Sequence, residues 1–323
     1  MTPGLSRREF VRHTTRLVAG IGATAVCGQA IPAAETSRIA VTCRDAMLPH
    51  VGQSDCWSAL AAVGAEGVEA VITDALALPG LRHPDRKYTV ATQAGLEQLQ
   101  ADMRAAGRQI TAFCMFNRLD ERPEIEIEWS AKVARAAQTL GIKAIRIDVV
   151  PHKLKPEQFL DFSVATLRKV MAATEGTGVA FGIENHGRVS NDPEFLQPLF
   201  ERVGSPRLGL TLDVGNFYWF GHPLSKLYKI VEKFAPRVFH THCKSIAFPA
   251  GQREQQRPVG WEFGRYTCPL YAGDIDYGRV VEILKKAGYA NDLCVEDESL
   301  SHFPNAEHAG ILQREIEYLK KLR

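Results

Sequence analysis

From residue 38 to its C-terminus, the chain alternates short apolar runs with longer segments of helical periodicity. Several runs are almost continuously apolar, which is typical of parallel strands buried on both faces. The segments between them repeat apolar residues every three or four positions, as amphipathic helices do. The predicted strands are Arg38–Thr42, Gly67–Thr73, Gln109–Phe116, Ala144–Val150, Val179–Glu184, Leu208–Asp213, Val238–His242 and Leu293–Glu296.

The predicted helices alternate with these strands. They are Cys56–Val63, Thr92–Ala106, Glu126–Leu140, Pro156–Thr174, Pro193–Val203, Pro223–Phe234, Tyr277–Ala287 and Ala306–Leu322. Asp192 and Asp276 directly precede two of them and are typical N-cap residues. Gly107, Gly141 and Gly288 follow three others, as C-terminal glycines do. Eight strands alternating with eight helices predict an α/β fold, a (βα)8 TIM barrel, occupying residues 35–323 as a single domain.

Four predicted strands end in a residue that commonly binds metal. Glu184, Asp213 and His242 are 29 residues apart (213 − 184 and 242 − 213), and Glu296 follows 54 residues later (296 − 242). One βα unit takes roughly 30 residues, so the first three recur once per unit, and the last gap fits a unit plus a long loop. The strand ends of a parallel barrel meet at one face, where the chemistry of TIM barrels takes place.

These four side chains predict a site for a divalent ion, because two Glu, one Asp and one His form an oxygen-rich set of donors. Mn²⁺ is the expected ion, with Mg²⁺, Co²⁺ or Zn²⁺ as alternatives. Residues two positions away on a strand point to the same face. From this alternation and from their positions at strand or loop ends, we identify five further residues that could bind substrate or support the ligands. They are His186, Asn216, His240, Lys244 and Glu298.

The longest predicted loop, residues 245–272, follows the strand that ends at His242. It carries Arg253, Arg257 and Trp261, which we expect to contact substrate, since long loops in compact domains are usually functional. A shorter segment, residues 74–88, is a second candidate for substrate contacts. A solvated surface loop is the alternative interpretation for both segments.

The N-terminus predicts export. Residues 6–12 read Ser-Arg-Arg-Glu-Phe-Val-Arg and resemble a twin-arginine signal, and a mild apolar run covers residues 17–26. That run has ten residues, whereas a membrane-spanning helix needs about 20. We therefore expect a leader over residues 1–34, recognition by the twin-arginine export machinery, and a periplasmic or secreted protein. A basic N-terminal helix of a cytosolic protein is the alternative.

Composition narrows the classes of partner. The 323 residues carry a formal net charge of +2. The leader has a net charge of +3, from Arg7, Arg8, Arg12 and Arg16 less Glu9. The net charge of the rest of the chain is therefore near 2 − 3 = −1. This balance lacks the basic tract expected of nucleic-acid binding, and no long apolar run past the leader predicts a membrane span. The six cysteines beyond the leader are scattered, which is typical of small buried residues.

Five motifs make the chain similar to the xylose-isomerase-like TIM barrel superfamily of sugar phosphate isomerases and epimerases. They are Ile183–His186, Leu212–Asn216, His240–Lys244, Gly273–Tyr277 and Val295–Glu296. The resemblance implies that Glu184, Asp213, His242 and Glu296 hold one divalent ion and that the two glutamates transfer protons. Asn216 stands where the ketose 3-epimerases often have His, and their Arg shortly after the metal-binding His is absent. The sequence is therefore more similar to the isomerase and dehydratase branches.

Residues and resemblance together predict an exported, metal-dependent isomerase, epimerase, dehydratase or lyase. Its expected substrate is a non-phosphorylated sugar, keto-sugar or cyclitol, which reacts through an enediolate with Glu184 and Glu296 as the acid–base pair. A non-catalytic sugar-binding barrel is one alternative, and an endonuclease IV-like phosphodiesterase is another. The sequence leaves the exact reaction and the formation of a homo-oligomer open.

Overall fold

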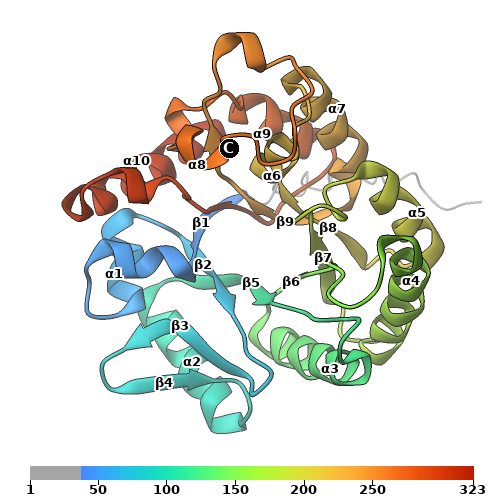
Figure 1. Cartoon of the computed structure of the whole chain (residues 1–323). Helices are drawn as coiled ribbons and strands as arrows, with labels where there is room; N and C mark the ends of the chain where they lie inside the picture. The colour runs from blue at the N-terminus through green and yellow to red at the C-terminus, as the bar shows by residue number, and fades with distance from the viewer. Residues whose placement is uncertain (1–37) are drawn as a thin grey trace, which may run out of the picture. The chain divides into compact units, whose positions relative to one another are not determined.

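Eight parallel strands form the centre of the molecule in the computed structural model, which describes residues 38–323 (Figure 1). The expected leader, residues 1–34, lies outside this range. The strands are β1 (Ala40–Arg44), β2 (Gly67–Val71), β5 (Gln109–Met115), β6 (Ala144–Ile147), β7 (Ala180–Glu184), β8 (Leu208–Asp213), β9 (Val238–His242) and β12 (Asp292–Val295). They are ordered β12-β1-β2-β5-β6-β7-β8-β9, and a parallel bridge between Cys243 and Val295 brings the last strand to the first. The predicted TIM barrel is confirmed.

The helices surround this ring of strands (Figure 1). They are α1 (Cys56–Val63), α2 (Gln93–Ala106), α3 (Pro123–Leu140), α4 (Pro156–Ala173), α5 (Pro193–Val203), α6 (Val214–Trp219), α7 (Leu224–Phe234), α8 (Phe263–Tyr266), α9 (Tyr277–Lys286) and α10 (Asn305–Leu322). Short 3-10 helices cover residues 45–51, 235–237, 250–252, 270–272 and 300–302. Within residues 38–323, no helix is both long and apolar enough to cross a bilayer.

Local sequence signals place most helix ends correctly. The Asp192 carboxylate accepts a hydrogen bond from the backbone N–H of Glu194, and Asp276 accepts one from Arg279. Gly107 and Gly141 end their helices in the left-handed conformation, with φ of 60° and 74°, which costs glycine little. The eight predicted helices are all present, with ends that differ by at most three residues.

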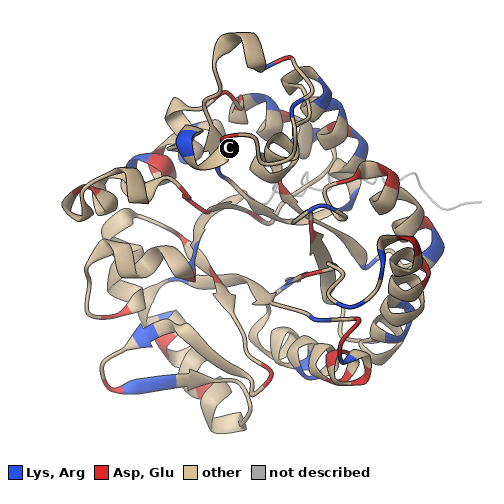
Figure 2. Ribbon diagram, in the orientation of Figure 1, with Lys and Arg blue, Asp and Glu red and all other residues tan. Residues whose placement is uncertain are grey.

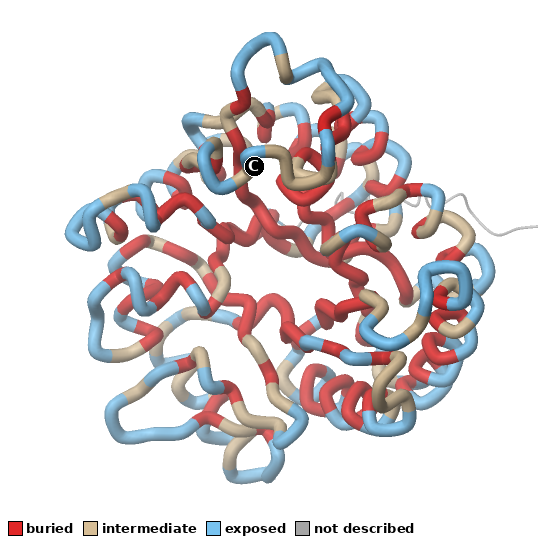
Figure 3. Tube along the Cα trace, in the orientation of Figure 1, coloured by how far each residue is buried: buried red, intermediate tan, exposed pale blue. Residues whose placement is uncertain are grey.

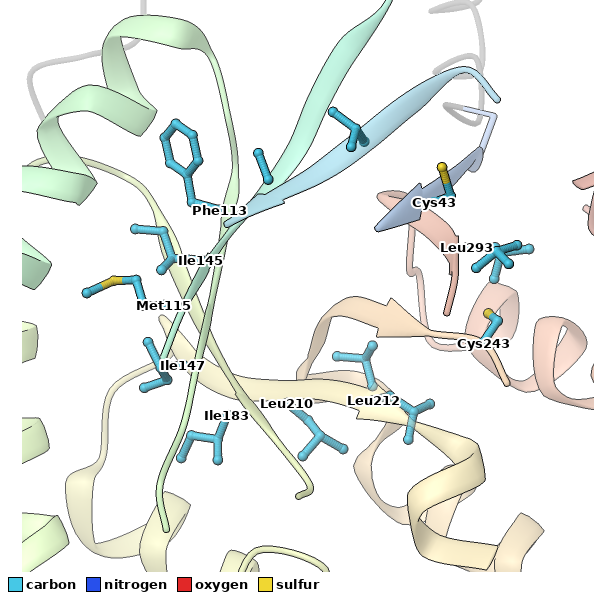
Figure 4. Close-up of a cluster of buried hydrophobic side chains, with 14 of the residues drawn as sticks. Cys43, Phe113, Met115, Ile145, Ile147, Ile183, Leu210, Leu212, Cys243 and Leu293 are labelled. Atoms are coloured by element: carbon cyan, nitrogen blue, oxygen red, sulfur yellow. The ribbon is translucent and has the colours of Figure 1, made fainter. Parts of the chain in front are cut away.

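The apolar residues of the strands pack between the ring and the helices. Figure 4 shows this layer with strand residues such as Phe113, Ile145, Ile183 and Leu210, all of them fully buried. Figure 3 shows that buried residues follow the strands, whereas the exposed ones lie on the outer helices and loops. The alternate strand residues point inward, and these are the ones that carry the polar site.

Three elements differ from the predicted pattern. The segment expected as a loop, residues 74–88, instead forms most of an antiparallel hairpin of β3 (Ala77–His83) and β4 (Arg86–Thr89). Residues 245–272 are also structured, since β10 (Ser245–Ile246) pairs with β11 (Thr267–Cys268). The short helix α6 begins directly after β8 because the Asp213 carboxylate caps it, accepting a bond from the Asn216 N–H at 2.8 Å.

Candidate metal centre

The four predicted metal ligands meet inside the barrel. Glu184, Asp213 and His242 are the last residues of β7, β8 and β9, and Glu296 follows β12. Each is at least 94% buried, and one donor atom from each lies within 4.8 Å of the others. Figure 2 shows residues of both charge signs on the strand ends around the ring. Parallel strand ends therefore converge as the 29-residue spacing predicts.

His242 lies at the middle of this group. Its Nδ1 is 3.2 Å from Oε1 of Glu184, 3.3 Å from Oε2 of Glu296 and 4.0 Å from Oδ2 of Asp213. Oδ2 of Asp213 is buried, and the cation beside it is the Lys244 ammonium, 2.9 Å away. Three carboxylates and an imidazole that converge in this way fit a divalent ion such as Mn²⁺, Mg²⁺, Co²⁺ or Zn²⁺.

Asp213 is fixed by its neighbours on both sides. The Asn185 side chain donates to the Asp213 carbonyl at 2.7 Å and accepts from its N–H at 2.9 Å. A Cβ on Gly215 would lie 2.5 Å from Cγ of Lys244, so glycine is required for that lysine to approach. Burial raises the pKa of Asp213 to about 7, although the Lys244 ammonium opposes this.

Glu184 is held by two side chains. Arg146, from β6, donates from Nε to Oε2 of Glu184 at 2.6 Å, and the amide of Asn216 donates to Oε1 at 3.2 Å. Burial alone would raise the pKa of Glu184, but Arg146 and His242 bring it well below its usual range. Glu184 is therefore ionised at neutral pH.

Glu296 lies between two cations. Lys244 Nζ is 3.1 Å from Oε2 of Glu296, and Arg44 from β1 forms an ion pair with Oε1. The same ammonium is 2.9 Å from Oδ2 of Asp213 and 2.8 Å from Oε1 of Glu298. Burial acts to lower the pKa of Lys244, but the three carboxylates raise it well above its usual range. Lys244 is therefore protonated and stays fully charged in the site.

His242 is oriented from the opposite side by Glu69 of β2. Oε2 of Glu69 is 2.9 Å from Nε2 of His242, and Arg44 Nε is 2.9 Å from the same oxygen. A carboxylate that accepts from one ring nitrogen leaves the other free to bind a metal, which is a common arrangement around metal-binding histidines. The geometry thus turns Nδ1 of His242 toward the three carboxylates.

The predicted substrate-binding residues fall into two groups. Asn216, Lys244 and Glu298 contact the metal centre as described, and His186 lies at its edge with Nδ1 3.3 Å from Oδ1 of Asp148. That hydrogen bond outweighs burial and raises the pKa of His186, whose side chain remains 54% exposed. His240 lies deeper, with Nδ1 2.8 Å from Oδ1 of Asp292.

The second group, from the 245–272 segment, contacts other residues than the metal ligands. The Arg257 guanidinium is sandwiched between Tyr218 and Phe248, 4.5 and 4.3 Å from their ring centroids, and donates only to backbone carbonyls. Arg253 Nε is 3.0 Å from Oδ1 of Asp274, and Trp261 stacks on Tyr266. The contacts of Arg253, Arg257 and Trp261 hold the 245–272 segment together, and their contact with substrate stays a prediction.

Sequence reasoning missed four residues near the site. Arg44 lies two residues beyond the predicted strand Arg38–Thr42, whereas Glu69 and Arg146 lie inside predicted strands, and their inward parity was the available signal. Phe116 follows β5, is 48% exposed, and its ring centroid lies 5.0 Å from the Arg146 guanidinium carbon. An exposed aromatic ring beside the charged strand ends can stack on the apolar face of a sugar.

The sequence of this chain is similar to a known protein family and to one curated protein. The xylose isomerase-like TIM barrel family matches residues 57–322. An uncharacterized protein of Methanocaldococcus jannaschii is 24% identical over 147 residues, which are 44% of this chain and 45% of that protein. The chain thus matches less than half the length of this curated relative.

Three solved structures share the fold. The IOLI protein with a bound zinc atom has a TM-score of 0.64 at 17% identity, covering 88% of this chain and 99% of that one. A xylose isomerase-like TIM barrel protein from Mycobacterium smegmatis, in complex with magnesium, has 0.61 at 15% identity, covering 88% and 96%. The probable 3-DHS dehydratase AsbF from Bacillus anthracis has 0.62 at 15% identity, covering 87% and 99%. At these identities the likeness concerns the fold alone.

Proposed function

Because the chain belongs to the xylose isomerase-like TIM barrel family, we propose that it is a metal-dependent isomerase, epimerase, dehydratase or lyase. One observation carries the proposal. Glu184 and Glu296 come from different strands and reach Nδ1 of the same histidine, at 3.2 and 3.3 Å, in a buried site. Two carboxylates beside one metal position are what proton transfer to and from a single substrate carbon requires.

Glu184, Asp213, His242 and Glu296 would hold the ion. When bound, a divalent ion in this position would acidify the C–H bond beside a substrate carbonyl. Glu184 or Glu296 then takes that proton to give an enediolate. The other carboxylate, once it has taken a proton from solvent, delivers that proton to the carbon to complete isomerisation or epimerisation, or to a leaving oxygen in dehydration or lyase chemistry.

We propose a non-phosphorylated sugar, keto-sugar or cyclitol as substrate. Polar groups that reach the site, such as Asn216, His186 and Glu298, suit hydroxyl groups, and the exposed ring of Phe116 suits the apolar face of a sugar ring. The cations at the centre, Arg44, Arg146 and Lys244, each contact carboxylates of the protein itself. They are therefore already neutralised, which favours a neutral substrate over a phosphorylated one.

Export is part of the proposal and rests on the twin-arginine pattern at residues 6–12. That pathway carries folded proteins, which suits a barrel that acquires its ion before export. Sugars without phosphate are the substrates expected outside the cytoplasm.

A screen tests the function directly. The purified protein is supplied with Mn²⁺, Mg²⁺ or Co²⁺ and incubated with oxidised sugars, glycosides and inososes, and products are followed by NMR. We expect one class to be converted, with loss of activity on chelation and recovery on adding the ion. Tight binding of a sugar without turnover would favour the sugar-binding barrel. Turnover unaffected by chelators would contradict a metal-dependent mechanism.

A further inference from the structure

A second group of donors lies deeper in the barrel than the metal centre. His240 and Cys294 precede His242 and Glu296 by two residues, so they point to the same face about 7 Å lower along the strands. Glu69 approaches them from β2. All three residues are at least 99% buried, and one donor atom from each lies within 4.8 Å of the others.

The hydrogen bonds around His240 determine which ring nitrogen is free. Asp292 accepts from Nδ1 of His240 at 2.8 Å, from the Thr42 hydroxyl at 3.0 Å and from the Tyr289 hydroxyl at 3.1 Å. Because these groups all direct donors at Asp292, its carboxylate is the acceptor toward His240, and Nδ1 carries the hydrogen. Nε2 of His240 then faces the interior of the group.

Two buried polar atoms without hydrogen-bond partners face each other at this point. Nε2 of His240 lies 3.4 Å from Oε1 of Glu69, and both atoms are buried without a hydrogen-bond partner. Such a pair needs a positive charge between or beside its members, either a proton or a metal ion. If two ligand atoms each lie about 2.0 Å from one Zn²⁺ ion with tetrahedral geometry, the two atoms are about 3.3 Å apart. The observed separation fits that geometry.

We propose that Glu69, His240 and Cys294 bind a second divalent ion. Donors of three kinds, a carboxylate, an imidazole and a thiolate, select Zn²⁺ or Co²⁺ over the harder Mg²⁺ or Mn²⁺. Cys294 releases its proton to the solvent when the ion enters, as coordinating thiols do. No bond to carbon forms or breaks, and no redox step is involved.

The second ion would support the first site. Oε1 of Glu69 faces the lower group, while Oε2 of the same carboxylate is 2.9 Å from Nε2 of His242. An ion bound to Oε1 fixes the carboxylate that orients His242. This inference goes beyond the proposed reaction and does not depend on it, because its test measures bound metal rather than turnover.

Cobalt provides the test. The metal-free protein is reloaded with Co²⁺, the bound metal is counted by elemental analysis, and the near-ultraviolet spectrum is recorded. We expect two ions per chain and a thiolate-to-cobalt charge-transfer band. The upper centre contains no thiolate, so this band reports the lower site alone. Cys294→Ser should lose the band and one ion.

Two variants separate the sites. Cys243→Ser removes a buried thiol outside the donor group and should keep the band and both ions. Asp213→Ala should lose only the upper ion and keep the band. Retention of the band in Cys294→Ser, or a single ion in the wild-type protein, would overturn the second site. If Cys294→Ser does not fold, X-ray absorption of the wild-type protein decides, since a sulfur about 2.3 Å from the metal is expected and its absence would refute the proposal.

Discussion

Arg146 binds one oxygen of Glu184 and leaves the other facing His242. Its Nε lies 2.6 Å from Oε2 of Glu184, whereas Oε1 of the same carboxylate is 3.2 Å from Nδ1 of His242. Arg146 is itself 99% buried. A guanidinium in this position keeps the carboxylate ionised and fixes its orientation.

Replacing Arg146 should therefore cost stability. Arg146→Met leaves the carboxylates of Glu184 and Asp148 buried without their cation, and breaking such a pair typically costs about 3–5 kcal/mol. Denaturant unfolding measures the loss. The matched control is Arg202→Met, since Arg202 pairs with Asp161 at the exposed surface, where about 1 kcal/mol or less is expected. Equal losses in the two variants would contradict the structural role of Arg146.

Metal content tests the upper centre. Asp213→Ala and His242→Ala each remove one donor and should abolish binding of the upper ion, while circular dichroism shows that the barrel remains folded. Asp276→Ala is the control, because that carboxylate only caps α9. Full metal content in both ligand variants would show that the ion is held elsewhere.

The two glutamates can be separated by isotope exchange. Glu296→Gln and Glu184→Gln keep one oxygen donor but remove the base, so we expect turnover to fall at least ~10²-fold, the low end for a positioned acid–base group. In deuterated water the wild-type enzyme should place deuterium on the carbon beside the substrate carbonyl. If the carboxylates serve opposite faces, one variant should retain this exchange without completing the reaction. Near wild-type turnover in both would leave them as ligands only.

His222 predicts a pH-dependent loss of stability. It is 96% buried near the rings of Phe217 and Phe220, and burial lowers its pKa to about 4. In the unfolded chain the pKa is about 6.5. Between these values the unfolded state binds a proton that the folded state does not, so stability falls as pH decreases from about 6.5 to 4 and levels off below.

At pH 5 this difference amounts to about 2 kcal/mol. His222→Gln cannot gain a proton, so its free energy of unfolding should decline less between pH 7.5 and 5 than that of the wild type. His152→Gln, at an exposed position, is the control and should follow the wild-type dependence. Parallel curves for wild type and His222→Gln would rule out a neutral buried imidazole.

Export has its own test. Changing Arg7 and Arg8 to Lys keeps the positive charge but removes the paired arginines that the twin-arginine machinery recognises. We expect the precursor to remain in the cytoplasm, folded and loaded with metal, as cell fractionation would reveal. Changing Arg12 and Arg16 to Lys instead should leave export intact. Normal delivery of the first variant to the periplasm would show that residues 6–12 are not such a signal.

The sequence predicted the elements that depend on local pattern. The strand ends at Glu184, Asp213 and His242 followed from apolar runs with a 29-residue spacing, and parallel strands bring such ends together wherever the barrel closes. The caps at Asp192 and Asp276 followed from local hydrogen-bonding preference. These features need no knowledge of distant contacts.

Other features depend on partners far away in the chain. Glu69 is 173 residues from His242 and Arg44 is 252 residues from Glu296, so neither pairing leaves a local trace. Arg257 looked like a free cation in a loop, but Tyr218 and Phe248 enclose it. The hairpin in residues 74–88 was missed because polar residues and two prolines interrupt its alternation.

The construction of the 245–272 segment bears on how the protein can change during evolution. The segment is held by contacts of its own, with Arg257 between Phe248 and Tyr218 of α6 and with β10 paired with β11, whereas the donors of the centre lie on β7, β8, β9 and just after β12. Exposed residues of the segment can therefore vary without moving the donors. A library restricted to its exposed positions should leave metal affinity unchanged.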